Sequence, residues 1–192
     1  MTRPNTREQL LDAGLKTLLE KGFNGTGVQD ITALAGVPKG SFYNHFESKE
    51  ALGAEIVQCY AQRGNARRAI LRDTSVPPLE RLRRHYIATI ESFASSNFER
   101  GCLLGNFSAE MSNQSPLIRE SLQDLFAQWT RDLEVAIKDA QDQGAIANKT
   151  DAADLAAFLL DSYEGAVLRA RVEKTSRPFD RFMDLIFTKI LV

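Results

Sequence analysis

Apolar positions recur along the chain at the spacing of a helix. Near the N-terminus, Leu11, Leu15 and Leu18 lie at i, i+4 and i+7, which places them on one helical face. Thr6 and Gln9 have the spacing of a capping box at the start of this helix. No segment alternates apolar and polar residues with period two for long enough to form a strand. The pattern predicts an all-α fold.

Three more helices are predicted before residue 72, separated by short turns. One begins at Thr26, whose hydroxyl is placed to cap it, and the three-residue turn 36–38 follows. A very short helix then covers residues 39–46. Ser48 caps a fourth helix that continues to about residue 71. A helix, a tight glycine-containing turn and a short second helix together predict a helix-turn-helix.

Residues 73–78 contain two prolines and several small or polar residues, and they are predicted to separate two parts of the chain. Four longer helical stretches follow, one of them starting with Ser115 as cap and Pro116 at the first helical position. The stretch 150–173 is apolar on two faces, and the last stretch covers 179–191. The expected domains are a helix-turn-helix domain over residues 1–50 with a linking helix over 48–71, and a helical domain over 72–192.

Composition and charge permit several classes of protein and exclude others. The formal net charge is −1, with ten basic and seven acidic side chains in residues 1–72 and fourteen against eighteen thereafter. This distribution permits DNA binding without requiring it. Two cysteines are too few for a disulfide scaffold, and no apolar run approaches the roughly 20 residues of a membrane span. The N-terminus has no signal-peptide pattern, so we expect a cytoplasmic protein.

The short helix over residues 39–46 carries the pattern of a recognition helix. Phe42 and Phe46 are four residues apart and share the buried face. Their neighbours then point outward, where glycine lets the backbone approach DNA and hydroxyl or amide groups hydrogen-bond to bases. Lys39, Ser41 and Asn44 are predicted to read bases, with Gly40 at the point of close approach. Tyr43, His45 and Lys49 are predicted to contact phosphates.

Residues 24–55 resemble the signature of the TetR (tetracycline-repressor) family, most closely over 36–52. There the glycine turn, Lys-Gly, an aromatic pair, His-Phe and Ser-Lys-Glu occur together at fixed spacing. The resemblance implies three DNA-binding helices, a linking fourth helix and a C-terminal domain that binds ligand and dimerises. It also implies that five residues face DNA: Thr26, Lys39, Tyr43, His45 and Lys49.

The resemblance and the helical pattern together predict a function. We expect a ligand- or electrophile-responsive transcriptional repressor that binds a palindromic operator as a homodimer, without cofactor or metal. The two apolar faces of the stretch 150–173, with the final helix, predict a dimer interface within residues 150–191, where Leu160 and Phe187 are candidate contacts. The alternative is that both faces lie inside one monomer core.

Aromatic and polar residues of the middle helices are candidates for an effector site, because such sites combine apolar walls with a few polar groups. Ordinary core packing is the alternative for each of them. The candidates are Tyr86, Cys102, Asn106, Phe107, Phe126, Trp129 and Tyr163, with Phe158 as a further aromatic candidate.

Cys102 is the candidate reactive group. The segment 100–107 is similar to the Gly-Cys-Leu stretch of family members that sense electrophiles or oxidants through a cysteine. At a helix N-terminus beside Arg100, the pKa of the Cys102 thiol would fall below its usual range. The alternative is a small buried residue that fills space, as we expect for Cys59.

Two other functions are weighed against this hypothesis. An enzyme with Cys102 as nucleophile and His85 as base would lack a recognisable oxyanion site and leave the helix-turn-helix unexplained, so no enzymatic activity is expected. An effector-independent architectural DNA-binding protein would have a strongly basic surface, which a net charge of −1 argues against.

Overall fold

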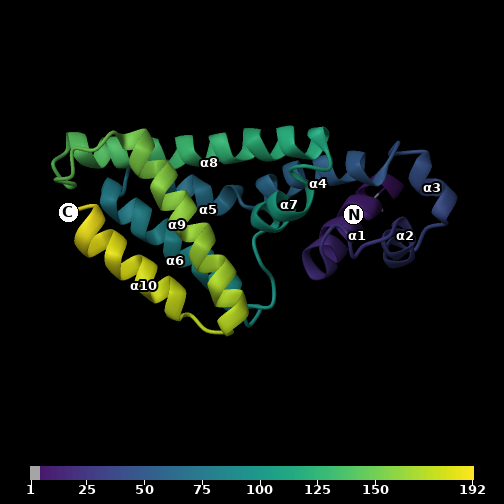
Figure 1. The fold of residues 1–192 in the computed structure, drawn as a ribbon. Coiled ribbons are helices and arrows are strands. Elements are labelled where there is room, and N and C mark those ends of the chain that lie inside the picture. Colours follow the sequence, from purple (N-terminus) through teal and green to yellow (C-terminus); the bar gives the residue numbers. More distant parts are fainter. Residues whose placement is uncertain (1–4) are drawn as a thin grey trace. The chain divides into compact units, whose positions relative to one another are not determined.

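The computed structural model describes residues 5–192, and every regular element within this range is helical (Figure 1). The all-α prediction is therefore confirmed. No helix in the described range has the length and apolar character needed to cross a membrane. The chain divides into two compact units, one formed by the residues up to Arg63 with 102–125, the other by 64–101 with 126–192. This division differs from the expected boundary at residues 73–78, because residues 102–125 pack with the N-terminal helices.

The two units share one long helix, whose N-terminal part belongs to the first unit and whose remainder belongs to the second. The first unit contains α1 (Thr6–Lys21), α2 (Val28–Ala35), α3 (Lys39–Tyr43), α4 (Lys49–Arg63), α7 (Leu103–Met111) and the start of α8 (Pro116–Asp142). The second unit contains α5 (Asn65–Ala69), the 3-10 turn η1 (Ile70–Arg72), α6 (Pro78–Ala94), the rest of α8, α9 (Ala152–Glu173), α10 (Arg177–Leu185) and the π-helical turn η2 (Ile186–Ile190).

Helices α1 and α2 each begin one residue away from the predicted threonine cap. Asn5 caps α1, where its side chain accepts from the Glu8 N–H at 2.9 Å and the Glu8 carboxylate accepts from the Asn5 N–H at 3.2 Å. The Gly27 N–H, at the start of α2, donates to the Asp30 carboxylate at 2.8 Å. In both cases an acidic side chain at the third helical position sets the start, because it accepts from the cap N–H and interacts favourably with the helix dipole.

The predicted caps of α4 and α8 are confirmed. The Ser48 hydroxyl accepts from the Ala51 N–H at 3.1 Å, and the Ser115 hydroxyl accepts from the Ile118 N–H at 3.3 Å. Helix α4 ends at Arg63 instead of continuing unbroken to residue 71, because a glycine turn at Gly64 separates it from α5. Glycine inside a helix costs about 0.5–1 kcal/mol relative to alanine, which favours a break at this point.

Aromatic side chains from connecting segments form the core of the first unit. Phe23, in the loop between α1 and α2, contacts Phe107 of α7 edge to face, with ring centroids 5.5 Å apart. Phe42 and Phe46 are both buried as predicted, although α3 already ends at Tyr43. A Cβ atom on Gly53 of α4 would lie 2.9 Å from the Phe23 ring, so the helix approaches this ring as closely as glycine permits. Helix α7 thus completes the core of the N-terminal helices.

The second unit buries aromatic rings and charged side chains. In its aromatic core, the ring centroid of Tyr86 in α6 lies 4.9 Å from that of Phe182 in α10 and 5.5 Å from that of Tyr163 in α9. Arg68 and Asp132 are 6% and 7% exposed and lie 3.6 Å apart, and Asp132 also pairs with Arg72. These ion pairs fasten α5 and η1 to α8.

A second buried arginine holds the connection between η1 and α6. Arg81, only 3% exposed, donates to the carbonyls of Leu71 and Val76 at 3.2 and 2.9 Å. It also pairs with Asp139 of α8 at 3.0 Å. The segment predicted as a domain boundary is therefore fixed within the second unit.

Candidate DNA-binding and effector sites

Helices α2 and α3 form the predicted helix-turn-helix. Gly36 ends α2 in the left-handed conformation, with φ 70° and ψ 30°, which allows the chain to reverse direction at once. The Val37 N–H donates to the Thr32 carbonyl at 3.0 Å and closes the turn. Helix α3 begins directly after Pro38, and its Phe42 side chain is fully buried. The turn and the buried ring fix the orientation of α3 against the first unit.

The predicted base- and phosphate-contacting residues of α3 lie together on one exposed polar surface. Tyr43 is 57% exposed, and a Cβ atom on Gly40 would meet no atom within 4 Å in residues 5–192, its own helical backbone aside. Ser41 is partly buried, while the others are exposed. We call this set the recognition surface: Lys39, Gly40, Ser41, Tyr43, Asn44 and His45. Their individual DNA contacts remain predictions.

Two other predicted DNA contacts have different surroundings. The Thr26 side chain is 1% exposed and its hydroxyl donates to the Gly22 carbonyl at 2.7 Å, which contradicts the prediction that it faces DNA. The Lys49 ammonium donates to the carbonyls of Phe23 and Thr26 at 2.9 and 2.8 Å. These hydrogen bonds direct the Lys49 ammonium to the loop between α1 and α2, and its predicted phosphate contact stays a prediction.

The effector candidates fall into two groups, one in each unit. Cys102 lies directly before α7, at its N-terminus as expected, and is 4% exposed, with its sulfur 3.8 Å from the Tyr60 hydroxyl. Asn106 lies one turn further along α7 and is partly buried. Phe107 is fully buried against Phe23 in the core of the first unit, and its predicted effector contact stays a prediction.

Tyr86, Phe126, Trp129 and Tyr163 all belong to the second unit. Tyr86 is 2% exposed, and its hydroxyl has no hydrogen-bond partner among the described residues. Burial raises the pKa of Tyr86, so the hydroxyl stays a donor. The Trp129 ring lies under the Arg68 guanidinium, 5.4 Å from its centroid, and Phe126 is partly buried. A buried hydroxyl in an aromatic cluster is the feature of this group that is least explained by packing.

Sequence reasoning missed four phenylalanines that extend this cluster. Phe93 and Phe98 lie 6.0 and 6.2 Å from Phe179, centroid to centroid, and Phe182 packs on both buried tyrosines. The spacing of Phe179 and Phe182 along α10 carried a signal for a shared face. Phe98 carried none, because it has a positive φ of 57° in the loop after α6.

His85 is also buried in the second unit. Its Nδ1 lies 3.0 Å from the Arg67 carbonyl. Burial lowers the pKa of His85 below its usual range, and the charges of Arg67 and Arg68 lower it further. His85 belongs to the second unit and Cys102 to the first.

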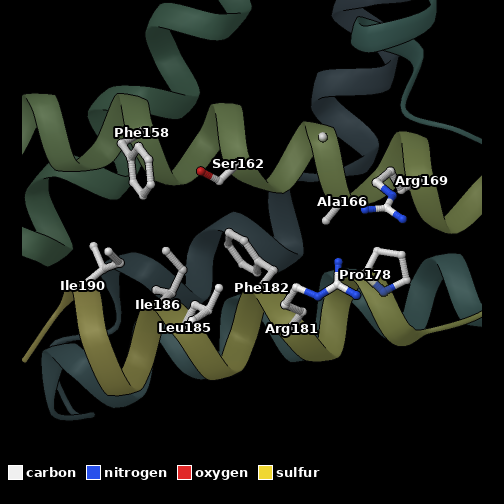
Figure 2. A pocket seen from close by; sticks show the side chains of 11 residues that line it. Phe158, Ser162, Ala166, Arg169, Pro178, Arg181, Phe182, Leu185, Ile186 and Ile190 are labelled. Carbon is white, nitrogen blue, oxygen red and sulfur yellow. The ribbon is translucent and has the colours of Figure 1, made fainter.

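An apolar groove of about 330 Å³ runs between α9 and α10. Figure 2 shows Phe158, Ser162 and Arg169 on the α9 wall, opposite Phe182 and further residues of α10 and η2. Phe158 is 48% exposed, which contradicts its prediction as an interior pocket residue. The suggested dimer contacts Leu160 and Phe187 are instead 5% and 8% exposed within one unit. Most residues of the two α9 faces expected to be apolar thus pack inside the unit, whereas Ser162 is partly exposed and lines the groove.

Comparisons with known proteins match nearly the whole chain. Residues 10–56 match the family model for bacterial regulatory proteins of the tetR family, and residues 78–186 match that for the tetracyclin repressor-like C-terminal domain. The HTH-type transcriptional repressor DhaR of Mycobacterium sp. (strain GP1) is 41% identical over 192 residues, covering 100% of this chain and 95% of the relative. The transcriptional regulator AcuR of Cereibacter sphaeroides is 34% identical over 176 residues, covering 91% and 80% of the two chains.

Solved structures give the same relationship. The regulatory protein TetR from Rhodobacter sphaeroides aligns with a TM-score of 0.89 and 33% identity, covering 97% of this chain and 99% of that one. E. coli NemR in its reduced form aligns with a TM-score of 0.81 and 27% identity, covering 93% and 94%. The similarity therefore extends across both compact units.

Proposed function

Because this chain belongs to the TetR family of bacterial transcriptional regulators, we propose that it represses transcription as a dimer on operator DNA and leaves the DNA when a small molecule binds its second unit. Two of the similar proteins, DhaR and NemR, are named transcriptional repressors. The observation that carries the proposal is the recognition surface, where exposed polar side chains lie on a helix anchored by the buried ring of Phe42.

The recognition surface fits the chemistry of a major groove. Residues at the N-terminal end of a recognition helix meet base edges, and Lys39, Gly40 and Ser41 occupy this end of α3. The amide of Asn44 suits bidentate contact with adenine, while Tyr43 and His45 suit phosphates. The open space at Gly40 lets the α3 backbone approach the groove edge.

DNA selection tests this proposal. The wild-type protein should select from random duplexes a sequence with two inverted half-sites, centred about 10 base pairs or a multiple apart. Gly40→Ala should keep the melting temperature of the protein and lose affinity for the selected duplex, because the added methyl is free in the protein and meets the DNA. Failure of the wild-type protein to enrich any sequence would refute the proposed function.

A second copy of the chain is proposed to cover the groove between α9 and α10. Phe158, Ser162, Gly165, Arg169 and Val172 lie alternately four and three residues apart, which is the spacing of a helix seam in a bundle. Phe158 and Val172 are 48% and 78% exposed, and among the described residues outside its own stretch of helix no atom would lie within 4 Å of a Cβ placed on Gly165. Two such faces from two copies would bury one another in a four-helix arrangement.

Replacing one apolar contact by a charge tests the dimer. Phe158→Glu should yield a folded monomer with lost affinity for the selected duplex, because the carboxylate would be buried between the copies. Val135→Glu is a matched control, since Val135 is 53% exposed on α8 and does not line the groove. Sedimentation of both variants at micromolar concentration measures the effect, and a dimeric Phe158→Glu would place the interface elsewhere.

The effector site is proposed at the aromatic cluster around Tyr86. A buried hydroxyl without a partner costs about 1–3 kcal/mol, and a ligand oxygen or nitrogen that accepts from it would recover this cost. Aromatic rings from α6, α9 and α10 would enclose the apolar part of the ligand. The proposed effector is therefore a small, largely apolar molecule with a hydrogen-bond acceptor.

An electrophile-responsive form of this regulator would use Cys102. The thiol lies at the start of α7 in contact with the Tyr60 hydroxyl, and packed interiors leave little room for an adduct. Treatment with N-ethylmaleimide should release the wild-type protein from its selected duplex, while Cys102→Ser should remain bound and Cys59→Ser should behave as wild type. Equal release of all three proteins would leave Cys102 as a packing residue beside a reversible ligand.

A further inference from the structure

The loop between α1 and α2 is held by two charged side chains from distant parts of the first unit. We call residues 22–27 the α1–α2 loop. From α4, the Lys49 ammonium donates to the Phe23 and Thr26 carbonyls at 2.9 and 2.8 Å. The same ammonium lies 4.3 Å from the centroid of the Phe23 ring. The Lys49 ammonium thus contacts both the backbone and the aromatic ring of this one loop.

From α7, Glu110 holds the same loop with the opposite charge. Its Oε2 accepts from the Asn24 N–H at 2.8 Å. Its Oε1 would lie 2.6 Å from a Cβ atom on Gly22, where the backbone has a φ of +76°, so the carboxylate lies directly against the loop. Hydrogen bonds with one charged partner are shorter and stronger than neutral ones. The carboxylate and the ammonium together fix both ends of the loop backbone.

The position of Glu110 is unfavourable for α7 itself. It lies in the last turn of α7, which contains no basic residue, and a negative charge there opposes the helix dipole. The contact with Asn24 offsets this cost. Stability of α7 alone therefore does not account for an acidic side chain at this position.

The α1–α2 loop leads without a break into the DNA-binding helices. The Gly27 N–H donates to Asp30 at the start of α2, and the turn after α2 places α3. We infer that Lys49 and Glu110 are positioning residues for DNA recognition: they set the α1–α2 loop and thereby the orientation of α2 and α3, and Glu110 makes this orientation depend on α7. The inference rests on the proposed DNA-binding function.

Variants of Glu110 separate positioning from general stability. Glu110→Ala should lower affinity for the duplex selected by the wild-type protein about tenfold, which corresponds to one charge-assisted hydrogen bond. Affinity for a random duplex of the same length should change less than twofold, because phosphate contacts do not require an exact helix orientation. Glu110→Gln should restore most of the loss, since its amide oxygen accepts from the Asn24 N–H. Glu120→Gln is the matched control, an exposed acidic residue on α8 of the same unit.

Hydrogen exchange supplies a readout that does not depend on DNA. Amides of residues 22–30 should exchange faster in Glu110→Ala than in Glu110→Gln or the control, while amides of α4 stay protected. If Glu110→Ala matches Glu120→Gln in affinity and exchange, the inference is wrong. The inference would also be overturned if Glu110→Ala lost affinity equally for the selected and the random duplex and had a correspondingly lower melting temperature. The proposed function fails only if the wild-type protein selects no duplex.

Lys49→Met distinguishes a loop clamp from a phosphate contact, because it keeps the length of the side chain and removes the charge. Loss of one phosphate contact lowers the slope of log affinity against log salt by about 0.9 on any duplex. A clamp instead predicts an unchanged slope and a smaller ratio of selected to random affinity. A reduced slope with an unchanged ratio would assign Lys49 to phosphate and leave Glu110 as the only positioning residue.

Discussion

The two compact units use charge in different ways. In the first unit, the ion pairs Arg7–Glu55, Arg63–Asp12 and Lys21–Asp30 all leave their side chains at least 41% exposed. In the second unit, the side chains of Arg68 and Asp132 are 7% and 8% exposed. Exposed pairs contribute little to stability, whereas loss of one partner of a buried pair is costly. The ion pairs of the first unit therefore add little to its stability, whereas the second unit contains an ion pair whose partners cannot be removed singly without a large cost.

The candidate DNA-binding site of the first unit and the candidate effector site of the second unit also differ in the exposure of their polar groups. The recognition surface is exposed, with its polar groups turned to solvent and its apolar anchors beneath. The Tyr86 hydroxyl is enclosed by aromatic rings. A surface for DNA must present polar groups before its partner arrives, while an interior site must leave a polar group unsatisfied until its ligand binds. The contrast makes four predictions.

The largest effect is expected at the buried ion pair. Asp132→Ala should destabilise the second unit by about 3–5 kcal/mol, because it removes the carboxylate that faces Arg68 inside the protein. The fluorescence of Trp129, the only tryptophan in the chain, reports unfolding of this unit in urea. Asp142→Ala is the control, since its pair with Lys138 lies at the surface. A similar urea midpoint for the two variants would contradict the proposal that the buried ion pair contributes more to stability than an exposed one.

On the recognition surface, the expected effect concerns binding and not stability. Asn44→Ala should weaken binding to the selected duplex by about 1–3 kcal/mol and leave random DNA unaffected, because it removes one base contact. Asn113→Ala, at an exposed position after α7, should change neither affinity. Fluorescence anisotropy with both duplexes measures the outcome. Equal weakening on both duplexes would reassign Asn44 to the phosphate backbone.

At the interior site, removal of a polar atom should stabilise the protein. Tyr86→Phe eliminates a buried hydroxyl that has no hydrogen-bond partner in residues 5–192, and it should raise the free energy of unfolding by about 1 kcal/mol. Tyr43→Phe, at an exposed position, should have no such effect. Urea denaturation followed by Trp129 fluorescence compares the two. A less stable Tyr86→Phe would mean that the hydroxyl is already satisfied in the free protein.

The smallest effect is a pH dependence confined to the second unit. The pKa of His85 is lowered by burial and by two neighbouring arginines, although Asp132 raises it. The unfolded chain therefore binds a proton near the ordinary pKa of about 6.5, at a pH where the native state does not. Stability should fall as pH drops from about 6.5 towards the lower native pKa, by at most about 1.4 kcal/mol per pH unit, and be independent of His85 above this window.

The pH prediction is tested with the two histidines of the chain. His85→Gln should abolish this acid dependence in Trp129 fluorescence, and His45→Gln should retain it. An unchanged pH dependence in His85→Gln would assign the acid sensitivity to other groups.

Prediction from sequence succeeded where the physical signal was local. The four-residue spacing of Phe42 and Phe46 placed the recognition surface, because helical periodicity alone decides which side chains point outward. The predicted starts of α1 and α2 were each wrong by one residue, since they were placed at the hydroxyls of Thr6 and Thr26, while Glu8 and Asp30 provide the stronger acceptor.

Prediction failed where a long-range contact decides the outcome. The edge-to-face contact of Phe107 with Phe23 could not be predicted, because the two rings lie far apart in the sequence. The directions of the Lys49 ammonium and the Tyr86 hydroxyl are likewise set by elements that periodicity does not bring together. The packing of residues 102–125 with the N-terminal helices could not be inferred from the prolines at 77 and 78. Prolines indicate where helices end, but they do not indicate which segments pack together.

The return of the chain to the first unit has a consequence for its biosynthesis. Asn24 and its partner Glu110 are separated by 86 positions. At about 5–20 residues per second, the ribosome needs roughly 4–17 s to complete this interval. During that time Phe23 lacks the ring of Phe107, and a nascent or truncated chain ending near Arg63 carries the recognition surface on an unfinished core. The N-terminal helices are thus the first to be made, but their core is complete only after residues 102–125 have been added.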